Sequence, residues 1–151
     1  LAGLGVRVSA PGVGRANLIA EQFGPLRLTV PALERLNNID EGITIATLRE
    51  HTLARPGDLL ALVKVIPFAV SAARVIDVEA TARENAPIFA IRPLRSRSSG
   101  LIVSGPPHAR TKLVEAFRNP VQKRLENLGS SLDDTIYASH MVAAIADAIR
   151  T

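Results

Sequence analysis

The sequence contains no cysteine, and this absence excludes several kinds of chemistry at once. Without thiols the chain has no disulfide bond, no thiolate metal site and no cysteine nucleophile. The three histidines, His51, His108 and His140, are scattered along the chain and lack the spacing of metal ligands. Aromatic residues are few, with four Phe, one Tyr and no Trp, so a core must rest mainly on aliphatic side chains.

Long hydrophobic runs and a strong net charge are also missing. No segment approaches the roughly 20 apolar residues that span a bilayer, and no signal peptide is visible. The net charge is only +4, because residues 1–92 hold 10 Lys or Arg against 9 acids and residues 93–151 hold 8 against 5. A balance this small does not indicate nucleic-acid binding. We therefore expect a cytoplasmic protein with neither a nucleic-acid nor a membrane partner.

The 151 residues, 47% of them hydrophobic, suffice for one domain or two small ones. In residues 1–92, short stretches of alternating hydrophobicity are separated by Gly and Pro turns, which is typical of a small β-sandwich or barrel. Pro31 suits the first position of a short helix, and Ser71 suits the N-cap of a helix over 72–84. We predict a β-rich domain with short helices over residues 1–92, with strands at 6–10, 15–20, 26–30, 59–66 and 88–91.

Residues 93–151 show a different order. The apolar run 100–103 indicates a buried parallel strand, and a helical pattern follows from 109 to 118. We expect Asn119 and Pro120 to begin a new or kinked helical segment, which Gly129 closes. Residues 135–138 predict a second strand, and Asp133-Asp134 predict a polar turn before it. Ser139 is expected to cap a final helix with Val142, Ile145, Ala146 and Ile149 on one face. The alternation of strands and helices predicts a parallel sheet, and thus a mixed α/β chain.

The loop Ser104-Gly105-Pro106-Pro107 ends the first of these strands. Open α/β sheets usually bind ligands at the carboxyl ends of their strands, so the Ser104 hydroxyl and the amides around Gly105 are candidates for binding an anion. Arg110 and Lys112 follow at the start of the helix, where cations oppose the helix dipole and so favour a role toward a ligand. An ordinary strand-to-helix turn is the alternative interpretation, because the loop carries no glycine fingerprint.

Several segments together resemble the molybdopterin-binding proteins of molybdenum-cofactor biosynthesis, the gephyrin-like molybdotransferase group. The resemblance covers most of the chain from Val6 onward, and it depends on the order of the segments rather than on any single motif. The segments are Val8-Ser9-Ala10-Pro11, Gly14-Arg15-Ala16-Asn17-Leu18, Leu36-Asn37-Asn38-Ile39-Asp40-Glu41-Gly42-Ile43-Thr44, Pro56-Gly57-Asp58, Val63-Lys64-Val65-Ile66-Pro67-Phe68-Ala69-Val70, Gly100-Leu101-Ile102-Val103-Ser104-Gly105 and Arg124-Leu125-Glu126-Asn127-Leu128-Gly129.

The resemblance implies that residues 93–151 form the first half of a three-layer α/β domain that binds molybdopterin, a pterin phosphate. It places cofactor binding at Ser104, Gly105, Pro106, Arg110 and Lys112. Some family members transfer an adenylyl group or insert metal with a divalent cation, so the resemblance implies magnesium in a parent protein. No catalytic residue is assigned, since the second phosphate loop and the acidic metal residues of the family would follow Thr151.

The sequence leaves two hypotheses about the function of the chain. The sequence begins at Leu1 rather than Met and stops where a third strand is expected, so we expect a piece of a longer molybdopterin-binding protein. The alternative is a non-catalytic interaction or scaffold module, in which the β-rich half serves homo-oligomer formation or partner docking and the Ser-Gly-Pro-Pro loop is only a turn.

Overall fold

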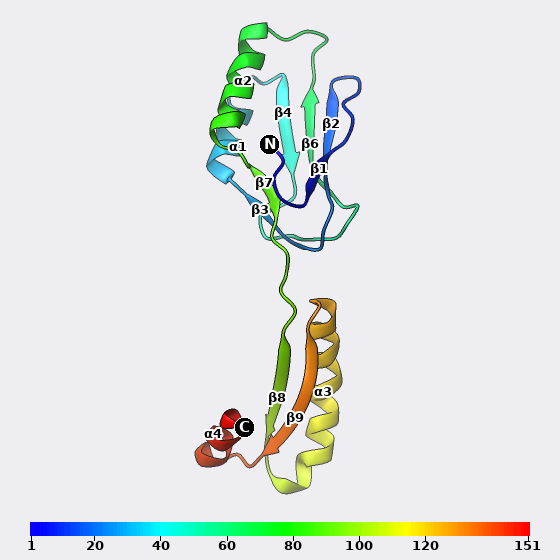
Figure 1. Cartoon of the computed structure of the whole chain (residues 1–151), viewed down its shortest axis with the longest axis vertical. Helices are drawn as coiled ribbons and strands as arrows, with labels where there is room; N and C mark the ends of the chain where they lie inside the picture. The colour runs from blue at the N-terminus through cyan, green and yellow to red at the C-terminus, as the bar shows by residue number, and fades with distance from the viewer. The chain divides into compact units, whose positions relative to one another are not determined.

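The computed structural model describes all residues from 1 to 151 and divides into two compact units, Leu1–Pro93 and Leu94–Thr151 (Figure 1). The division falls within one residue of the boundary expected from the sequence. Both units mix helices with strands, so the chain belongs to the mixed α/β class. No helix combines the length and the apolar character that a membrane crossing requires.

Two antiparallel sheets make up the first unit. The larger sheet has four strands in the order β1-β2-β6-β4, and its central pair places Arg15 opposite Lys64. The smaller sheet has the order β5-β3-β7. The strands are β1 (Val6–Val8), β2 (Arg15–Ala20), β3 (Gly24–Leu28), β4 (Ile43–Thr47), β5 (Leu53–Ala54), β6 (Leu59–Val65) and β7 (Phe89–Ile91).

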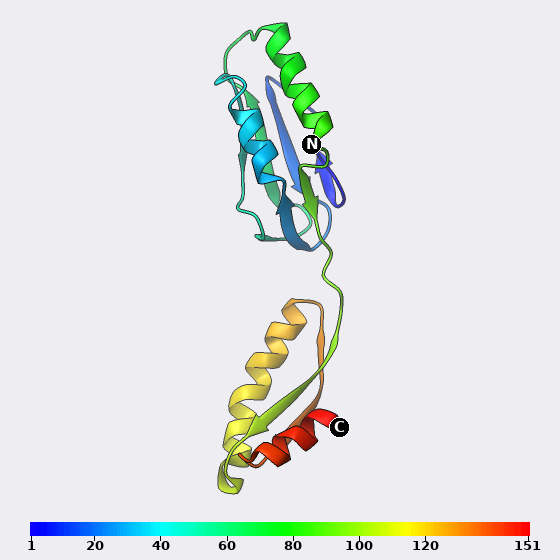
Figure 2. The ribbon, with the colours of Figure 1, turned by 90° about the vertical axis from the view of Figure 1, so that its left-hand side faces the viewer.

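Helices α1 (Val30–Asn37) and α2 (Ala72–Glu84) lie side by side in this unit (Figures 1 and 2). Pro31 is the second residue of α1, one position later than predicted, because the helix already begins at Val30. Ser71 occupies the predicted N-cap position of α2, but its hydroxyl makes no capping hydrogen bond. The core forms because alternate strand residues turn inward: in β2, Leu18 and Ala20 are buried. Fifteen of the chain's 17 buried hydrophobic residues belong to this unit, including Phe89, Leu26, Leu36 and Leu60.

The second unit contains the predicted order of strand, helix, strand and helix. Its strands β8 (Ser98–Ser104) and β9 (Ser131–Ala138) pair in parallel, with Val103 opposite Tyr137. Helix α3 (Arg110–Asn127), preceded by the short 3-10 turn η1 (Pro107–Ala109), connects them, and α4 (Val142–Arg150) follows β9. Figure 1 shows α3 along one side of the strand pair and α4 along the other.

Burial in the second unit is slight. Val103 and Ala138 are its only buried hydrophobic residues. The predicted apolar face of the last helix is only partly covered, because Ile145 is half-buried while Val142 and Ile149 are 87% and 69% exposed. These two residues stay exposed because a two-stranded sheet offers too little surface to cover a whole helix face.

Three further local predictions need correction. Helix α3 runs through Pro120 without a break, so Asn119 does not begin a new helix. Strand β9 begins at Ser131 rather than at Thr135, so Asp133 and Asp134 lie within the strand and not in a turn before it. Ser139 does not cap α4, because Met141 holds the N-cap position.

The predicted stop at Gly129 is confirmed. Gly129 has φ +74°, which favours glycine. Its N–H donates to the Glu126 carbonyl and the Ser130 N–H donates to the Leu125 carbonyl, both at 2.9 Å. This pair of hydrogen bonds is the Schellman arrangement that satisfies the last carbonyl groups of a helix. It sets the point at which the chain turns back into β9.

Candidate ligand site at the strand ends

An open cavity of about 390 Å³ lies at the carboxyl ends of β8 and β9. Because the two strands are parallel, the loop after β8 and the residues after β9 reach the same edge of the strand pair. Open α/β sheets usually place their ligands at such an edge. The cavity is lined by Ser104, Gly105, Pro106, Pro107, Leu113, Ser139 and His140.

Ser104 and His140 form the polar corner of this cavity. The Ser104 Oγ atom lies 3.0 Å from the Nδ1 atom of His140, although 36 residues separate them in the sequence. The contact exists because the register places Ser104 opposite Ala138, two residues before His140. The Ser139 hydroxyl belongs to the same lining. Two strand ends therefore supply three side chains that can donate hydrogen bonds.

The loop after β8 is fixed by contacts with β9. The Tyr137 hydroxyl donates to the Pro106 carbonyl at 2.8 Å, and the Gly105 N–H donates to the Ala138 carbonyl at 3.2 Å. A Cβ atom on Gly105 would lie 2.7 Å from both the Tyr137 hydroxyl and a methyl group of Leu113. Glycine is thus needed at this position because neighbouring side chains approach the backbone closely.

Few backbone amides of this loop are free to bind an anion. The Gly105 N–H is already bonded to Ala138, and the Ala109 N–H donates to the Pro106 carbonyl at 3.0 Å. Pro106 and Pro107 have no N–H at all. Hydrogen-bond donors for a ligand must therefore come chiefly from side chains. Of the two donors predicted for this loop, the Ser104 hydroxyl is the one that can reach a ligand, because the Gly105 N–H is already bonded.

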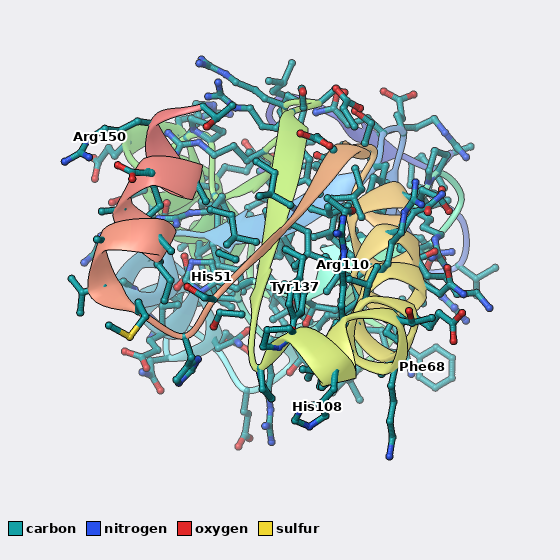
Figure 3. The ribbon with its side chains drawn as sticks, turned by 90° about the horizontal axis from the view of Figure 1, so that it is seen from below. His51, Phe68, His108, Arg110, Tyr137 and Arg150 are labelled. Atoms are coloured by element: carbon teal, nitrogen blue, oxygen red, sulfur yellow. The ribbon has the colours of Figure 1, made fainter.

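The predicted cationic residues lie beside the cavity and not in its lining. Arg110 is the first residue of α3 and Lys112 lies in its first turn. Both side chains are exposed and neither forms an ion pair. His108 lies in η1, at the turn between β8 and α3, and projects outward from the ribbon in Figure 3. Arg110 and Lys112 can attract an anion from a distance but do not line the cavity.

The rest of the cavity wall is apolar. Pro106, Pro107 and Leu113 face the opening together with the polar corner. A ligand with a flat apolar ring and an anionic group would match both parts. A hydroxyl beside an imidazole also resembles a nucleophile and its base, but no carboxylate bonds to His140 to orient it as the third member of a triad would. The pair is suited to binding.

Sequence reasoning found one half of this site and missed the other. Ser104, Gly105 and Pro106 line the cavity, and their binding of a cofactor stays a prediction, whereas Ser139 and His140 were not assigned to the site. A signal for them was present, since both directly follow the second predicted parallel strand. Parallel strands end at one edge of a sheet, so residues after the second strand approach the loop after the first.

A carboxylate lies at the opposite end of the same strands. Hydrogen bonds from the Ser131 hydroxyl and then from the Ser98 hydroxyl lower the pKa of Asp133 below its ordinary value of 3.8. Asp133 is fully exposed and lies at the amino end of β9, away from the cavity. Nowhere in the chain do three or more His, Asp or Glu side chains come together in a group that could hold a metal ion.

Comparisons with known protein families, with curated proteins and with solved structures found no match to this chain. The geometry of the strand ends is therefore the main physical evidence for what the protein binds.

Proposed function

We propose that the second unit binds molybdopterin, a pterin phosphate, at the cavity formed by the ends of β8 and β9. The observation that carries this proposal is the placement of Ser104, Gly105 and Pro106 in the lining of that cavity. The resemblance of residues 100–105 to the first strand and loop of a pterin-binding domain supports it. The protein would act in the biosynthesis or handling of the molybdenum cofactor in the cytoplasm.

The residues present fit such a ligand in two parts. The hydroxyls of Ser104 and Ser139 and the imidazole of His140 suit the phosphate, and Pro106, Pro107 and Leu113 suit one face of the pterin ring. Arg110 and Lys112 would raise the local concentration of the anion. The side chains offer no three-ligand site for magnesium, so the proposal assigns this chain binding alone and no catalytic step.

A larger parallel sheet belongs to the same proposal. Strands β8 and β9 pair only with each other, so each keeps one unpaired edge. Two strands rarely make a stable sheet, and further parallel strands on these edges would produce the three-layer domain that the resemblance implies. Helices α3 and α4 would then cover its two faces.

The test is an anaerobic titration of the whole chain with molybdopterin, followed by amide chemical shifts in NMR spectra. We expect shifts confined to the amides of Ser104, Gly105, Ser139 and His140, because Pro106 and Pro107 carry no amide proton. Ser104→Ala removes one hydrogen bond to a charged group, worth about 1.5–3 kcal/mol, and should weaken binding at least about tenfold. Ser99→Ala, on the same strand but outside the cavity lining, is the matched control. The proposal fails if no shifts occur, or if they occur only in residues 1–93.

One observation favours a second candidate function, a non-catalytic interaction module that forms a homo-oligomer. Met141, Val142 and Ile149 expose apolar surface on α4, and Phe117 does so on α3. Surface of this kind marks interaction sites when it is contiguous. Sedimentation of the chain at several concentrations tests it: self-association that Val142→Ser and Ile149→Ser abolish would support the module, and a monomer at all concentrations would exclude a homo-oligomer.

A further inference from the structure

The larger sheet of the first unit has an inner face in the core and an outer face that points away from it. In β2, Leu18 and Ala20 are buried, while Arg15 and Ile19 alternate with them and point outward. Helix α1 covers the inner face, where its Leu36 belongs to the same core cluster as Leu18. On the outer face, the side chains of three neighbouring strands, β2, β6 and β4, lie side by side (Figure 1).

Apolar side chains form a continuous strip on this outer face. The register places Ile19 opposite Leu59, and Ala46 opposite Leu62. A shallow cavity of about 250 Å³ is lined by Ala46, Leu59 and Leu62 together with Leu48. Leu59 and Leu48 are 46% and 39% exposed. We call these five residues the outer strip. Contiguous apolar surface that stays exposed marks interaction sites.

Two cations lie directly opposite each other at the end of the outer strip. Arg15 of β2 pairs with Lys64 of β6, and Lys64 is two residues along its strand from Leu62. Like charges in directly opposite positions destabilise a sheet. Both side chains are exposed and neither forms an ion pair, since Glu21, the acid that follows β2, pairs with Arg7 at 3.8 Å instead. We call Arg15 and Lys64 the cation pair.

A hydrogen bond within β2 orients one member of the cation pair. The Arg15 Nε–H donates to the Asn17 Oδ1 atom at 3.1 Å, which leaves the two terminal nitrogens of the guanidinium for another acceptor. Their fork matches the two oxygens of a carboxylate, whereas the compact ammonium of Lys64 can pair with a second carboxylate. Two carboxylates placed beside the outer strip would therefore replace repulsion between the cations by attraction.

We propose that the outer face of the larger sheet is a docking surface for an acidic amphipathic helix of a partner protein. The acidic character follows from the cation pair, which has no counter-ion in the chain. Helices cover sheet faces in mixed α/β chains, as α1 does on the inner face. Two strand residues separate the cation pair from the strip by about 7 Å, and helix residues four apart rise about 6 Å.

Two other occupants fit this face less well. A second copy packed on it by the same surface would bring two more cations to a pair that already lacks a counter-ion. Nucleic-acid bases need aromatic side chains for stacking, and the outer strip contains only aliphatic ones. The docking surface belongs to the first unit, so it does not depend on the ligand proposed for the second.

The cation pair is tested first in the free chain. Lys64→Gln removes one of two opposed charges, so it should raise the midpoint of urea unfolding of the first unit. Added salt should stabilise the wild type more than Lys64→Gln, because salt screens the same repulsion. A lower midpoint in Lys64→Gln would show that the pair stabilises the fold and would overturn the proposal.

Docking is measured with a synthetic amphipathic peptide of about 16 residues as the probe. Two Glu lie in its first helical turn, and Leu follows at the i+4 and i+7 positions on the same face. Titration of the whole chain should shift the amides of β2, β4 and β6 in NMR spectra and leave residues 94–151 unchanged. Replacement of both Glu by Gln in the peptide should weaken binding by about tenfold or more.

Variants assign the contact to the cation pair. The double variant Arg15→Glu, Lys64→Glu should lose the Glu peptide and bind a peptide with Lys in the same positions. Arg118→Glu, an equal change of charge at an exposed residue of α3, is the matched control and should bind the Glu peptide as the wild type does. Leu62→Ser should weaken the binding of either peptide.

Three results would overturn the proposal. The first is no binding of the Glu peptide by the wild type at millimolar concentration. The second is equal binding of that peptide by the wild type and the double variant. The third is tighter binding of the wild type to vesicles that contain anionic lipid than to the peptide, since a lipid surface would then be the better occupant of this face.

Discussion

Gly105 is the residue on which the shape of the cavity loop depends most directly. A methyl group there would lie 2.7 Å from the Tyr137 hydroxyl, which holds the Pro106 carbonyl. We expect Gly105→Ala to lower the free energy of unfolding of the second unit by about 1–3 kcal/mol, because the neighbours must shift. Urea denaturation followed by circular dichroism measures this change.

Gly100→Ala is the control for that prediction. Gly100 lies in β8, the strand that leads into the loop of Gly105, and a Cβ atom on Gly100 would meet nothing within 4 Å. The change should be within about 0.5 kcal/mol of zero. An equal cost at both positions would show that the close approach at Gly105 is not the cause.

Ionisation of Asp133 makes the free energy of unfolding of the second unit depend on pH under acidic conditions. Hydrogen bonds from the Ser131 and Ser98 hydroxyls hold the pKa of its carboxyl below 3.8 in the folded chain. A lowered pKa means that the stabilisation is complete above the ordinary value and is lost as the pH falls through the folded-state value. We expect Asp133→Asn to lower the midpoint of thermal unfolding at pH 7 and to match the wild type more closely as the pH falls from about 4 to about 2. Asp134→Asn, whose carboxylate bonds only a backbone N–H, should keep the acid-side slope of the wild type.

Ser104 and His140 show which residues of a site can be predicted from a sequence. Ser104 was found because its signal is local: an apolar run ends and turn residues begin. His140 was missed because its place beside Ser104 depends on the pairing of β8 with β9 across a helix of 18 residues. Short-range patterns do not contain that register, although the predicted parallel order implied it.

Helix α3 contains a proline in its interior, where proline destabilises a helix most. Pro120 lies inside the 18-residue helix and has no N–H for the Ala116 carbonyl. A proline in a helix interior lowers the free energy of unfolding by about 3 kcal/mol. It also restricts the unfolded chain, which offsets about 0.4–1 kcal/mol of that loss. We expect Pro120→Ala to stabilise the second unit by about 2 kcal/mol, measured by thermal unfolding followed at 222 nm.

Pro31→Ala tests whether any loss of proline would have the same effect. Pro31 lies in the first turn of α1, where no N–H is required. Its replacement should give no gain. A gain at Pro31 as large as that at Pro120 would show that the missing hydrogen bond in α3 is not the source of the difference.

Strand β9 illustrates why some element ends could not be predicted. Asp is unfavourable in strands on average, and Asp133-Asp134 therefore suggested a turn. In the structure β8 continues to pair down to Ser98, opposite Ser131, and the Ser98 hydroxyl donates to Asp133. Tertiary pairing overrode local preference there. Where the local signal and the pairing agree, as in the alternation of β2 and the glycine stop after α3, the prediction was right.

The two units differ in how much apolar surface they bury, and this difference predicts their order of unfolding. Fifteen buried hydrophobic residues stabilise residues 1–93, whereas Val103 and Ala138 are the only two beyond them. Burial of apolar surface is the main favourable term in folding. We therefore expect the second unit to open first, and a protease to digest it while the first unit survives.

Limited digestion with trypsin measures that order. Arg92, Arg95 and Arg97 are exposed in the segment without helix or strand before β8. Pro93 blocks cleavage after Arg92. The Arg97 N–H donates to the Ser130 hydroxyl and the Arg97 carbonyl accepts from the Ser131 N–H, so the first cut should follow Arg95. A fragment that ends at residue 95 should persist while residues 98–151 are degraded, and Arg95→Gln should delay the first cut. Early cleavage after Arg49, which is exposed in the loop between β4 and β5, would instead show that the larger core does not make the first unit the more stable one.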